Sequence, residues 1–527
     1  MVINSVSRIT VAFCLALAAV PAIGQPVAQP IAHPVGRPDP LAKSTEQWQA
    51  LAAADLKAVR EAMRSSHPGA IDEANPEFQQ LVDSGYAQAQ QLIPRVTDYQ
   101  SAIAAVRSYV TLFRDGHLAY SDNVRQANDV IESNGIGISL VKGRYVVNAV
   151  LPEWPVALPP VGAELVSCDG LTPRQISDQR HAPYYSRRQT GSDLQVLASQ
   201  MHIRDFAGDE LKQCTYRTPQ GHVLQLDVKY RGFQTKAYFR EVMPALAKGM
   251  PGAPAERGNA YTFSDGLLWI HAANFNLRAE SSEAADLEKM IAEITALTGV
   301  KHIVFDTRGN RGGDSRIGGK IFNAATGGLE YDQENLAGLQ RTYAQWRVSD
   351  VAIAMLAWQI ERMRKMHGAD SAPAREAATM HQRLLDAKAA GEPWLRQEGS
   401  YRITQADIAR RGGHLRRFDG TLVLVTDQEC ASACLDFADL VRSVPASVHM
   451  GQTTSADTVY LERGSLKLPS GNLLFMPLKA WRNRLRGNNE PWVPEVPLTG
   501  DMSDTAAVRS AVLGVIASRR QSKPLEN

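Results

Sequence analysis

Ser432 is the residue whose position along the chain points most directly to chemistry. It follows an apolar run from Thr421 to Thr426 and a short turn, and it stands where a helical pattern begins. A hydroxyl at the start of a helix lies at the positive end of the helix dipole, which stabilises an anion that approaches or forms there. The pattern predicts a nucleophilic serine, although a serine at this position can also act only as the N-cap of the helix.

A glycine-rich turn supplies the second part that such a site needs. An apolar run from Lys301 to Phe305 leads into residues 306–313, which end in Gly312 and Gly313. Backbone amides of a turn like this can converge on one point and form an oxyanion hole, where each donor stabilises the transition state by about 3 kcal/mol. The glycine spacing fits neither of the two common phosphate-binding motifs, so we do not expect a nucleotide site.

The elements around these residues predict an α/β fold. Short apolar segments alternate with helical patterns over residues 255–510, which is typical of helices packed on a largely parallel sheet. Active sites in such sheets gather at the carboxyl ends of the strands. Charged helical patterns around 345–366 and 374–389 interrupt the alternation, and they predict an inserted helical hairpin at about 329–399. It could be a lid or a surface feature.

Two further regions precede this domain. Apolar residues at helical spacing predict an N-terminal helical region over 43–133, and short strand patterns predict a β-rich module over 134–232. The segment Gly135 to Ile138 is similar to the carboxylate-binding loop of a PDZ domain, which captures a peptide end by strand addition. The same pattern also fits a small barrel that only braces its neighbours.

The first 42 residues predict export. Arg8 precedes a short apolar run that ends near small residues, which is typical of a signal peptide over 1–24. A Pro-rich linker follows over 25–42. No other stretch approaches transmembrane length. We therefore expect a mature protein without a membrane span, in the periplasm or secreted.

Charge and cysteine content narrow the function further. The 57 Lys and Arg residues nearly balance the 55 Asp and Glu residues, which disfavours a nucleic-acid partner. An oxidising compartment permits disulfides. Cys168 with Cys214 is a plausible pair, whereas Cys430 and Cys434 could be bridged or merely buried. No cysteine or histidine spacing indicates a zinc site, so we expect no metal.

Several short motifs in one order resemble a known family. They are Asp306 to Gly313, Ala431 to Ala433, Gly451 to Thr454 and Leu468 to Gly471. Together they are similar to the catalytic domain of the C-terminal processing and tricorn-type serine peptidases, the tail-specific protease superfamily. The resemblance implies that Ser432 is the nucleophile. It also implies that Gly312 or Gly313 donates to the oxyanion and that the amide of Ala433 is the second donor.

The branches of this family differ in the residue that acts as the general base. Processing peptidases carry a lysine shortly after the Gly-x-x-Thr motif, where this chain has Asp457. Tricorn-type members use a histidine that precedes the PDZ-like module, and His117 matches that element. An imidazole with a pKa near neutrality suits proton transfer to and from Ser432. Glu490 lies near the position of the family's third catalytic residue, and Asp457 is its rival.

The resemblance thus implies an exported serine endopeptidase that needs no cofactor. Ser432 would form an acyl-enzyme on a peptide or an unfolded protein, with His117 as base. Two alternatives stay open at this point. One is a catalytically silent member of the same superfamily that binds hydrophobic ligands or peptides, and the other is an esterase with the same triad.

Overall fold

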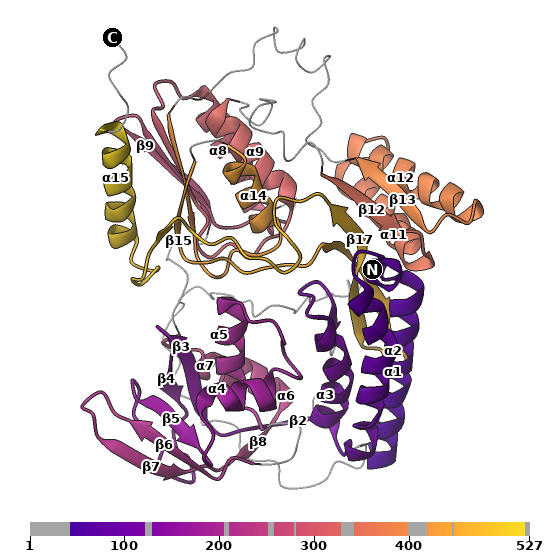
Figure 1. The fold of residues 1–527 in the computed structure, drawn as a ribbon, viewed down its shortest axis with the longest axis vertical. Coiled ribbons are helices and arrows are strands. Elements are labelled where there is room, and N and C mark those ends of the chain that lie inside the picture. Colours follow the sequence, from indigo (N-terminus) through magenta and orange to yellow (C-terminus); the bar gives the residue numbers. More distant parts are fainter. Residues whose placement is uncertain are drawn as a thin grey trace, which may run out of the picture.

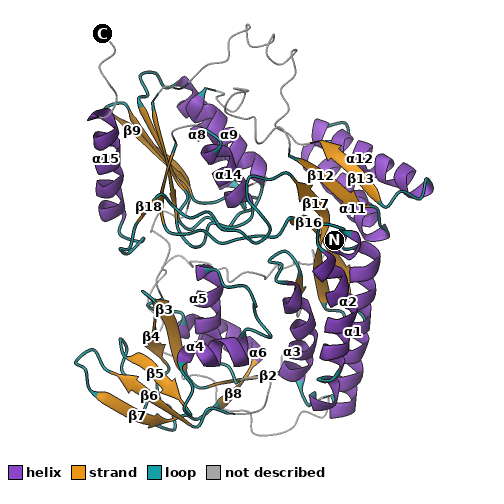
Figure 2. Ribbon diagram, in the orientation of Figure 1, coloured by secondary structure: helices purple, strands orange, loops and turns teal. Residues whose placement is uncertain are grey.

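The computed structural model describes residues 43–121, 129–204, 210–250, 258–278, 281–327, 342–398, 418, 420–444 and 447–521. The predicted signal peptide and Pro-rich linker lie outside the described residues. Figures 1 and 2 show a group of N-terminal helices, a β-rich module beside them, and a larger domain in which helices cover a sheet. Within the described ranges, no helix is both long and apolar enough to cross a bilayer.

The N-terminal part is helical, as predicted. It consists of α1 (Thr45–Ser66), η1 (Pro68–Ile71), α2 (Pro76–Gln90), η2 (Ile93–Arg95), α3 (Tyr99–Val110) and η3 (Thr111–Phe113). The α-helices are capped by the preceding residues Ser44, Asn75 and Asp98, whose side chains accept backbone N–H groups of the first turn. Apolar side chains such as Leu56 and Tyr109 pack into a core that also contains strands of the larger domain.

The β-rich module is built on an antiparallel sheet in the order β3-β4-β5-β6-β7. Cys168 in β5 and Cys214 in β6 form a disulfide across this sheet. A second, two-stranded sheet pairs β2 with β8. The strands are β2 (Val130–Ser133), β3 (Ile136–Val141), β4 (Arg144–Val150), β5 (Glu164–Cys168), β6 (Gln213–Arg217), β7 (Val223–Asp227) and β8 (Arg231–Gln234). The helices are α4 (Pro173–Ile176), η4 (Ser177–His181), α5 (Gly191–Gln200), α6 (Thr235–Ala237), η5 (Tyr238–Val242) and α7 (Met243–Leu246).

The larger domain confirms the α/β prediction. Its six-stranded sheet has the order β18-β15-β14-β11-β10-β9, and every neighbouring pair is parallel except β10 with β9. Helices α8, α9 and α14 cover one face and α15 covers the other (Figure 1). The bounds are β9 (Asn259–Ser264), β10 (Leu267–Ala272), α8 (Ser282–Ala296), β11 (His302–Asp306), α9 (Ser315–Thr326), β14 (Thr421–Thr426), α14 (Ala433–Arg442), β15 (Val448–Gly451), β18 (Val496–Pro497) and α15 (Thr505–Gln521).

A second sheet joins this domain to the N-terminal helices. It has the order β1-β17-β12-β13, with β16 also paired to β17. Strand β1, which directly follows the helices, lies antiparallel to β17, so the chain near residue 120 reaches a strand more than 350 positions later. The strands are β1 (Ala119–Ser121), β12 (Tyr343–Arg347), β13 (Trp394–Glu398), β16 (Tyr460–Lys467) and β17 (Leu473–Arg482).

The insertion contains the expected helical hairpin, but strands flank it. Helices α11 (Asp350–His367) and α12 (Ala372–Ala389) lie between β12 and β13. The expectation of helix from about Gln345 is wrong, because Ala344 and Trp346 alternate with less buried neighbours and pair with β13 and β17. Trp346 and Leu384 belong to the core shared with the N-terminal helices. Part of the insertion therefore braces that core.

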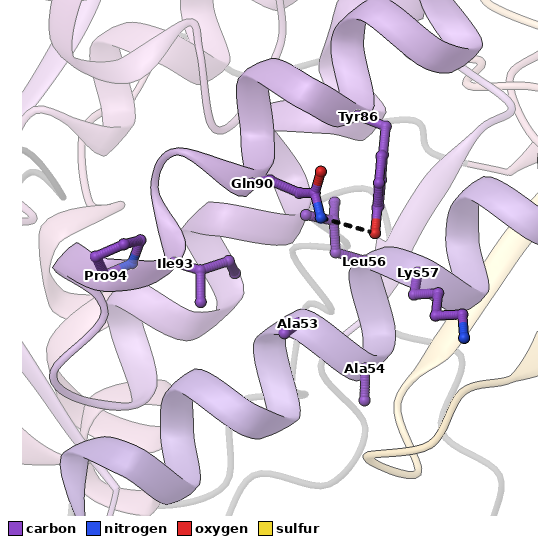
Figure 3. Close-up of a pocket in the computed structure, with 8 residues that line it drawn as sticks. All are labelled: Ala53, Ala54, Leu56, Lys57, Tyr86, Gln90, Ile93 and Pro94. Carbon is purple, nitrogen blue, oxygen red and sulfur yellow. Dashed lines mark hydrogen bonds between the residues drawn. The ribbon is translucent and has the colours of Figure 1, made fainter.

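A pocket of about 530 Å³ lies between α1 and α2 (Figure 3). Its wall includes Leu56, Tyr86, Gln90 and Ile93, and the amide of Gln90 donates a hydrogen bond to the Tyr86 hydroxyl. None of its lining residues belongs to a motif that the sequence analysis singled out. This pocket is therefore separate from the residues that the sequence predicts to be functional.

Candidate active site

Ser432 occupies a sharp turn between strand β14 and helix α14. Its backbone has φ 54° and ψ −122°, a conformation that is uncommon for a residue with a side chain. Ser432 is the N-cap residue of α14, yet its side chain accepts no hydrogen bond from the helix. The hydroxyl is therefore not used for capping. Such local strain is found where the surrounding structure holds a functional group in place.

A disulfide brackets this turn. Cys430 and Cys434, two positions before and after Ser432, are joined with an S–S distance of 2.01 Å. Both cysteines are fully buried, and they form a small apolar cluster with Leu435 and the half-buried Trp492. The cross-link closes the turn and the first residues of α14 into a single ring, which restricts the positions that the Ser432 backbone can adopt.

The pairing of β1 with β17 brings His117 to this turn. Tyr120 in β1 lies opposite Leu474 in β17, and its buried hydroxyl donates to Asp55 Oδ2 in α1 over 2.8 Å. The same hydroxyl accepts a hydrogen bond from Asn472 Nδ2 over 2.7 Å. These bonds tie α1, β1 and the start of β17 together, so they fix the chain directly after His117.

His117 and Ser432 lie within hydrogen-bond distance. Nε2 of His117 is 3.1 Å from Oγ of Ser432. The imidazole is largely enclosed, with 14% of its side chain exposed. Burial lowers the pKa of His117, while the negative charges of Asp115 and Asp457 act to raise it. The neutral imidazole, which is the form able to accept a proton, is therefore favoured near pH 7.

The glycine turn after β11 lies against Ser432. A Cβ atom added to Gly312, where φ is 93°, would lie 2.8 Å from Cβ of Ser432 and 3.0 Å from the amide nitrogen of Ala433. One added to Gly313, where φ is 139°, would lie 2.1 Å from the carbonyl oxygen of Phe275. Only glycine fits at either position, because both the conformation and the space exclude a side chain.

The amides of this turn are not equivalent. The N–H of Gly312 donates to Oδ1 of the buried Asn310 over 2.9 Å. The amides of Gly313 and Ala433, by contrast, have no hydrogen-bond partner among the described residues. Of the three residues that the sequence suggested for an oxyanion hole, Gly312 has a donor that is already engaged, while Gly313 and Ala433 have donors that remain available.

Asp427 joins the two turns, and the sequence analysis did not identify it. One carboxylate oxygen accepts the N–H of Gly309 over 2.7 Å, and the other accepts the N–H of Glu429 over 3.0 Å. Burial raises the pKa of Asp427 to about 7, and the nearby charge of Glu429 adds to this effect. The side chain of Asp427 thereby holds the glycine turn against the turn that leads to Ser432. Its only sequence signal was a carboxylate directly after a buried strand.

The structure places the two candidates for the third residue in different surroundings. Glu490 is exposed, and its carboxylate accepts the N–H of Gly487 over 2.9 Å; no described contact joins it to His117. Asp457 is buried and paired with Arg484 and Arg486 over 2.5 and 2.7 Å. Burial raises the pKa of Asp457, but the two arginines outweigh this effect and lower it to about 2. Across the described ranges, no cluster of three or more His, Cys, Asp or Glu could hold a metal.

The β-rich module contacts the domain next to the site. Ser192 donates to Oγ of Ser455 over 3.2 Å, and the guanidinium of Arg188 donates to the carbonyl of Ala456 over 2.8 Å.

In the loop that resembles a carboxylate-binding site, two backbone amides already make hydrogen bonds within the loop. The N–H groups of Gly135 and Ile136 donate to side chains of the two residues just before them. These two amides are therefore engaged within the loop.

Helix α5 lies along the β3 edge of the module. The amide oxygen of Gln195 in α5 accepts the N–H of Leu140 in β3 over 2.9 Å. A Cβ added to Gly137 would lie 2.4 Å from the carbonyl oxygen of Leu246 at the end of α7. The first contact engages an edge amide that a peptide added to this strand would need, and the second shows that α7 lies close against the backbone of β3.

Comparison with known proteins agrees with this architecture. Residues 266–491 match the model of peptidase family S41. No curated protein sequence matches the chain. Mature CPAF has a similar fold, with a TM-score of 0.56 and 12% identity over 89% of this chain and 98% of that one. Mature CPAF complexed with lactacystin gives a TM-score of 0.54 and 12% identity over 89% and 99% of the two chains.

The family match includes the glycine turn, Ser432 and the strands around them. His117 lies outside the matched range, but the pairing of β1 with β17 brings it to the matched domain. The match of residues 266–491 to peptidase family S41 therefore agrees with the family that the sequence motifs predicted.

Proposed function

We propose that this chain is an exported serine peptidase in which Ser432 attacks the carbonyl of a peptide bond. His117 acts as the general base and then as the general acid, and the amides of Gly313 and Ala433 stabilise the oxyanion. Gly312 serves a different role, because its lack of a side chain lets the glycine turn lie against Ser432. The single observation that carries the proposal is the 3.1 Å separation of His117 Nε2 and Ser432 Oγ.

The chemistry follows from the positions of these groups. Nε2 of His117 takes the proton of the Ser432 hydroxyl as Oγ bonds to the carbonyl carbon. The carbonyl oxygen becomes negatively charged, and donors that are already in place stabilise it without reorganisation. The imidazolium then gives its proton to the leaving amine, and the acyl-enzyme forms. Water, deprotonated by the same imidazole, releases the acyl group by the reverse steps.

The surroundings of His117 suit these proton transfers. A base must be neutral before the reaction and must hold a proton briefly during it. Burial favours the neutral imidazole, and the acidic residues nearby support the transient imidazolium. The surroundings of Asp457 argue against the lysine-type mechanism of other family branches, because this carboxylate is paired with two arginines.

Proteolysis of a general substrate tests the proposal. The mature chain is expected to degrade unfolded casein, with activity lost in Ser432→Ala and reduced by a factor of about a hundred or more in His117→Ala. Mass spectrometry of the fragments distinguishes endopeptidase action, which we expect, from trimming at the ends. Casein hydrolysis that persists unchanged in purified Ser432→Ala would contradict the proposal.

Export is tested separately. The apolar run after Arg8 and the small residues that follow it support cleavage near residue 24. Expression in a bacterium followed by fractionation should place the chain outside the cytoplasm, and sequencing of its amino terminus should find a start close to Gln25. Recovery of the uncleaved chain from the cytoplasm would contradict this part of the proposal.

A further inference from the structure

We propose that Asp115 is the acidic positioning residue of the site, and that it holds His117 by its backbone and stabilises the imidazolium by its charge. This inference rests on the proposed function. Asp115 lies two residues before His117 and is buried. Its role is distinct from that expected for Glu490, because Asp115 acts from within the loop that carries the base.

The contact with the backbone of His117 is direct. Oδ1 of Asp115 accepts the N–H of His117 over 2.8 Å. A side chain that accepts the amide two residues later makes an Asx turn, which fixes the local backbone conformation. The same oxygen lies 3.9 Å from Nδ1 of the His117 ring. This separation is too long for a hydrogen bond but short enough for a strong interaction between charges in a buried site.

His67 lies on the other side of the Asp115 carboxylate. Nε2 of His67 lies 3.8 Å from Oδ2 of Asp115, and both side chains are fully buried. Nδ1 of His67 accepts the N–H of Gly69 over 3.0 Å. Because Nδ1 is an acceptor, the proton of the neutral ring must lie on Nε2, which faces Asp115. The ring is held by stacking on Phe78 and by an edge contact with Tyr460.

The tautomer of His117 follows from the same reasoning. To accept the Ser432 proton, Nε2 must be unprotonated, so the ring proton lies on Nδ1 on the side of Asp115. Nδ1 of His117, Oδ2 of Asp115 and Nε2 of His67 are all buried, and none of them has a hydrogen-bond partner within the described part of the chain. A carboxylate thus lies between two imidazole N–H groups. Buried polar atoms without partners are rare and are concentrated where they have a function.

Among the charged groups that act on His117, Asp115 has the charge that is least compensated by other partners. Two acids, Asp115 and Asp457, favour its imidazolium, and two arginines, Arg188 and Arg463, oppose it. Asp457 is already neutralised by its own arginine partners, and Arg188 is paired with an acid of the β-rich module. The ion pairs described for Asp115 are with the two histidines alone. Its negative charge therefore acts on His117 with little compensation.

Two neutral variants separate the charge from the backbone contact. Asp115→Asn keeps an oxygen that can accept the N–H of His117, and Asp115→Ser can make the equivalent turn with its hydroxyl. Asp178→Asn, an exposed acid of the β-rich module, is the matched control. Circular dichroism confirms folding, and the serine variant serves if the asparagine variant does not fold.

The primary readout is the pKa of His117, measured by NMR titration of the histidine Cε1 resonances and assigned with His117→Ala. We expect this pKa to fall in the neutral variants and to stay unchanged in Asp178→Asn. The rate of fluorophosphonate labelling should fall at least about tenfold in the same variants. An unchanged His117 pKa in the neutral variants overturns the inference.

The two readouts also keep this inference apart from the proposed function. Wild-type protein that does not react with fluorophosphonate contradicts the proposed serine chemistry, while the titration still decides the role of Asp115. Glu490→Gln adds a direct comparison. A fall in the His117 pKa in Glu490→Gln, with no change in Asp115→Asn, assigns the acidic role to Glu490 and overturns the inference.

Discussion

Nε2 of His117 and Oγ of Ser432 lie 3.1 Å apart, although 315 positions separate them in the sequence. The two residues come from different parts of the fold. His117 follows the N-terminal helices, and Ser432 begins a helix of the α/β domain. Strand β1 joins these parts by pairing with β17. The geometry of the site therefore depends on contacts between the range that matches peptidase family S41 and the chain that precedes it.

The buried hydroxyl of Tyr120 is expected to contribute to this arrangement. Tyr120→Phe leaves Asp55 and Asn472 each without one buried hydrogen bond, which should lower the free energy of unfolding by about 1–3 kcal/mol. Urea denaturation measures the change. Tyr86→Phe is the matched control, because the hydrogen bond described for the Tyr86 hydroxyl is with an exposed glutamine, and its effect should stay within about 0.5 kcal/mol. Equal effects of the two substitutions would contradict the anchoring role of Tyr120.

Gly312→Ala should abolish fluorophosphonate labelling in a folded protein. The added methyl would lie 2.8 Å from Cβ of Ser432, so the glycine turn or the serine must move. Gly319→Ala is the control, because that helical glycine has open space around its Cβ position. It should label normally and be slightly more stable, since alanine favours helix. Normal labelling of Gly312→Ala would show that the close approach is not required.

The two disulfides are expected to differ in what they stabilise. The pair Cys168–Cys214 spans 46 positions and Cys430–Cys434 spans 4. By loop entropy, replacing the long-range pair with alanines should cost about 4 kcal/mol, and replacing the short-range pair about 2 kcal/mol. Thermal unfolding of the two double variants measures both changes.

The rate of fluorophosphonate labelling of Ser432 should depend more on the Cys430–Cys434 disulfide than on the Cys168–Cys214 disulfide. Removing Cys430 and Cys434 frees the turn around Ser432 and should slow fluorophosphonate labelling markedly. Removing Cys168 and Cys214 should leave the labelling rate unchanged below the unfolding transition. Slower labelling in the Cys168 and Cys214 variant alone would contradict the role assigned to the short cross-link.

Buried histidines should make the protein less stable in acid. Burial lowers the pKa of His181 to about 3 and that of His202 to about 4. Between about pH 4 and 6.5 the unfolded chain therefore binds more protons at these positions than the folded chain. The free energy of unfolding should fall as pH decreases through this window, by up to about 1.4 kcal/mol per pH unit for each histidine.

The His181→Phe variant tests this effect, because phenylalanine keeps a buried ring that cannot be protonated. The stability of the variant relative to wild type should rise as the pH is lowered from 7 to 5. The raised pKa of Asp427 has the opposite effect on stability, because the folded state binds this proton more tightly and gains stability as the pH falls. This contribution is the same in both proteins and therefore cancels in the comparison. A constant stability difference across this range would contradict the prediction.

The sequence predicted those parts of the fold that local patterns encode. Strand β14 has the predicted bounds, and the parallel sheet follows from apolar strands alternating with helices. The strands that flank the hairpin were missed, because five-residue segments such as β12 gain their stability from pairing with β17 rather than from local sequence. Ser432 and His117 could be selected together only because the family resemblance connected two distant motifs.

The surroundings of these residues could not be predicted in the same way. No local pattern connects His67 with Asp115, because the position of His67 depends on its ring contacts with Phe78 and with Tyr460 in β16. Asp427 has no motif of its own, and its importance arises from burial between two turns. Tertiary contacts, which a single sequence does not encode locally, determine all three environments.

Mapping a fluorophosphonate adduct on the purified mature chain tests whether His117 activates Ser432 as a nucleophile. Tandem mass spectrometry should locate the adduct on Ser432, and labelling should be absent in Ser432→Ala and slowed by at least about a hundredfold in His117→Ala. His302→Ala, which alters a strand histidine, should retain the adduct. Folded wild-type protein that stays unlabelled, or an adduct that forms at the same rate without His117, would show that Ser432 and His117 do not act as a nucleophile and its base.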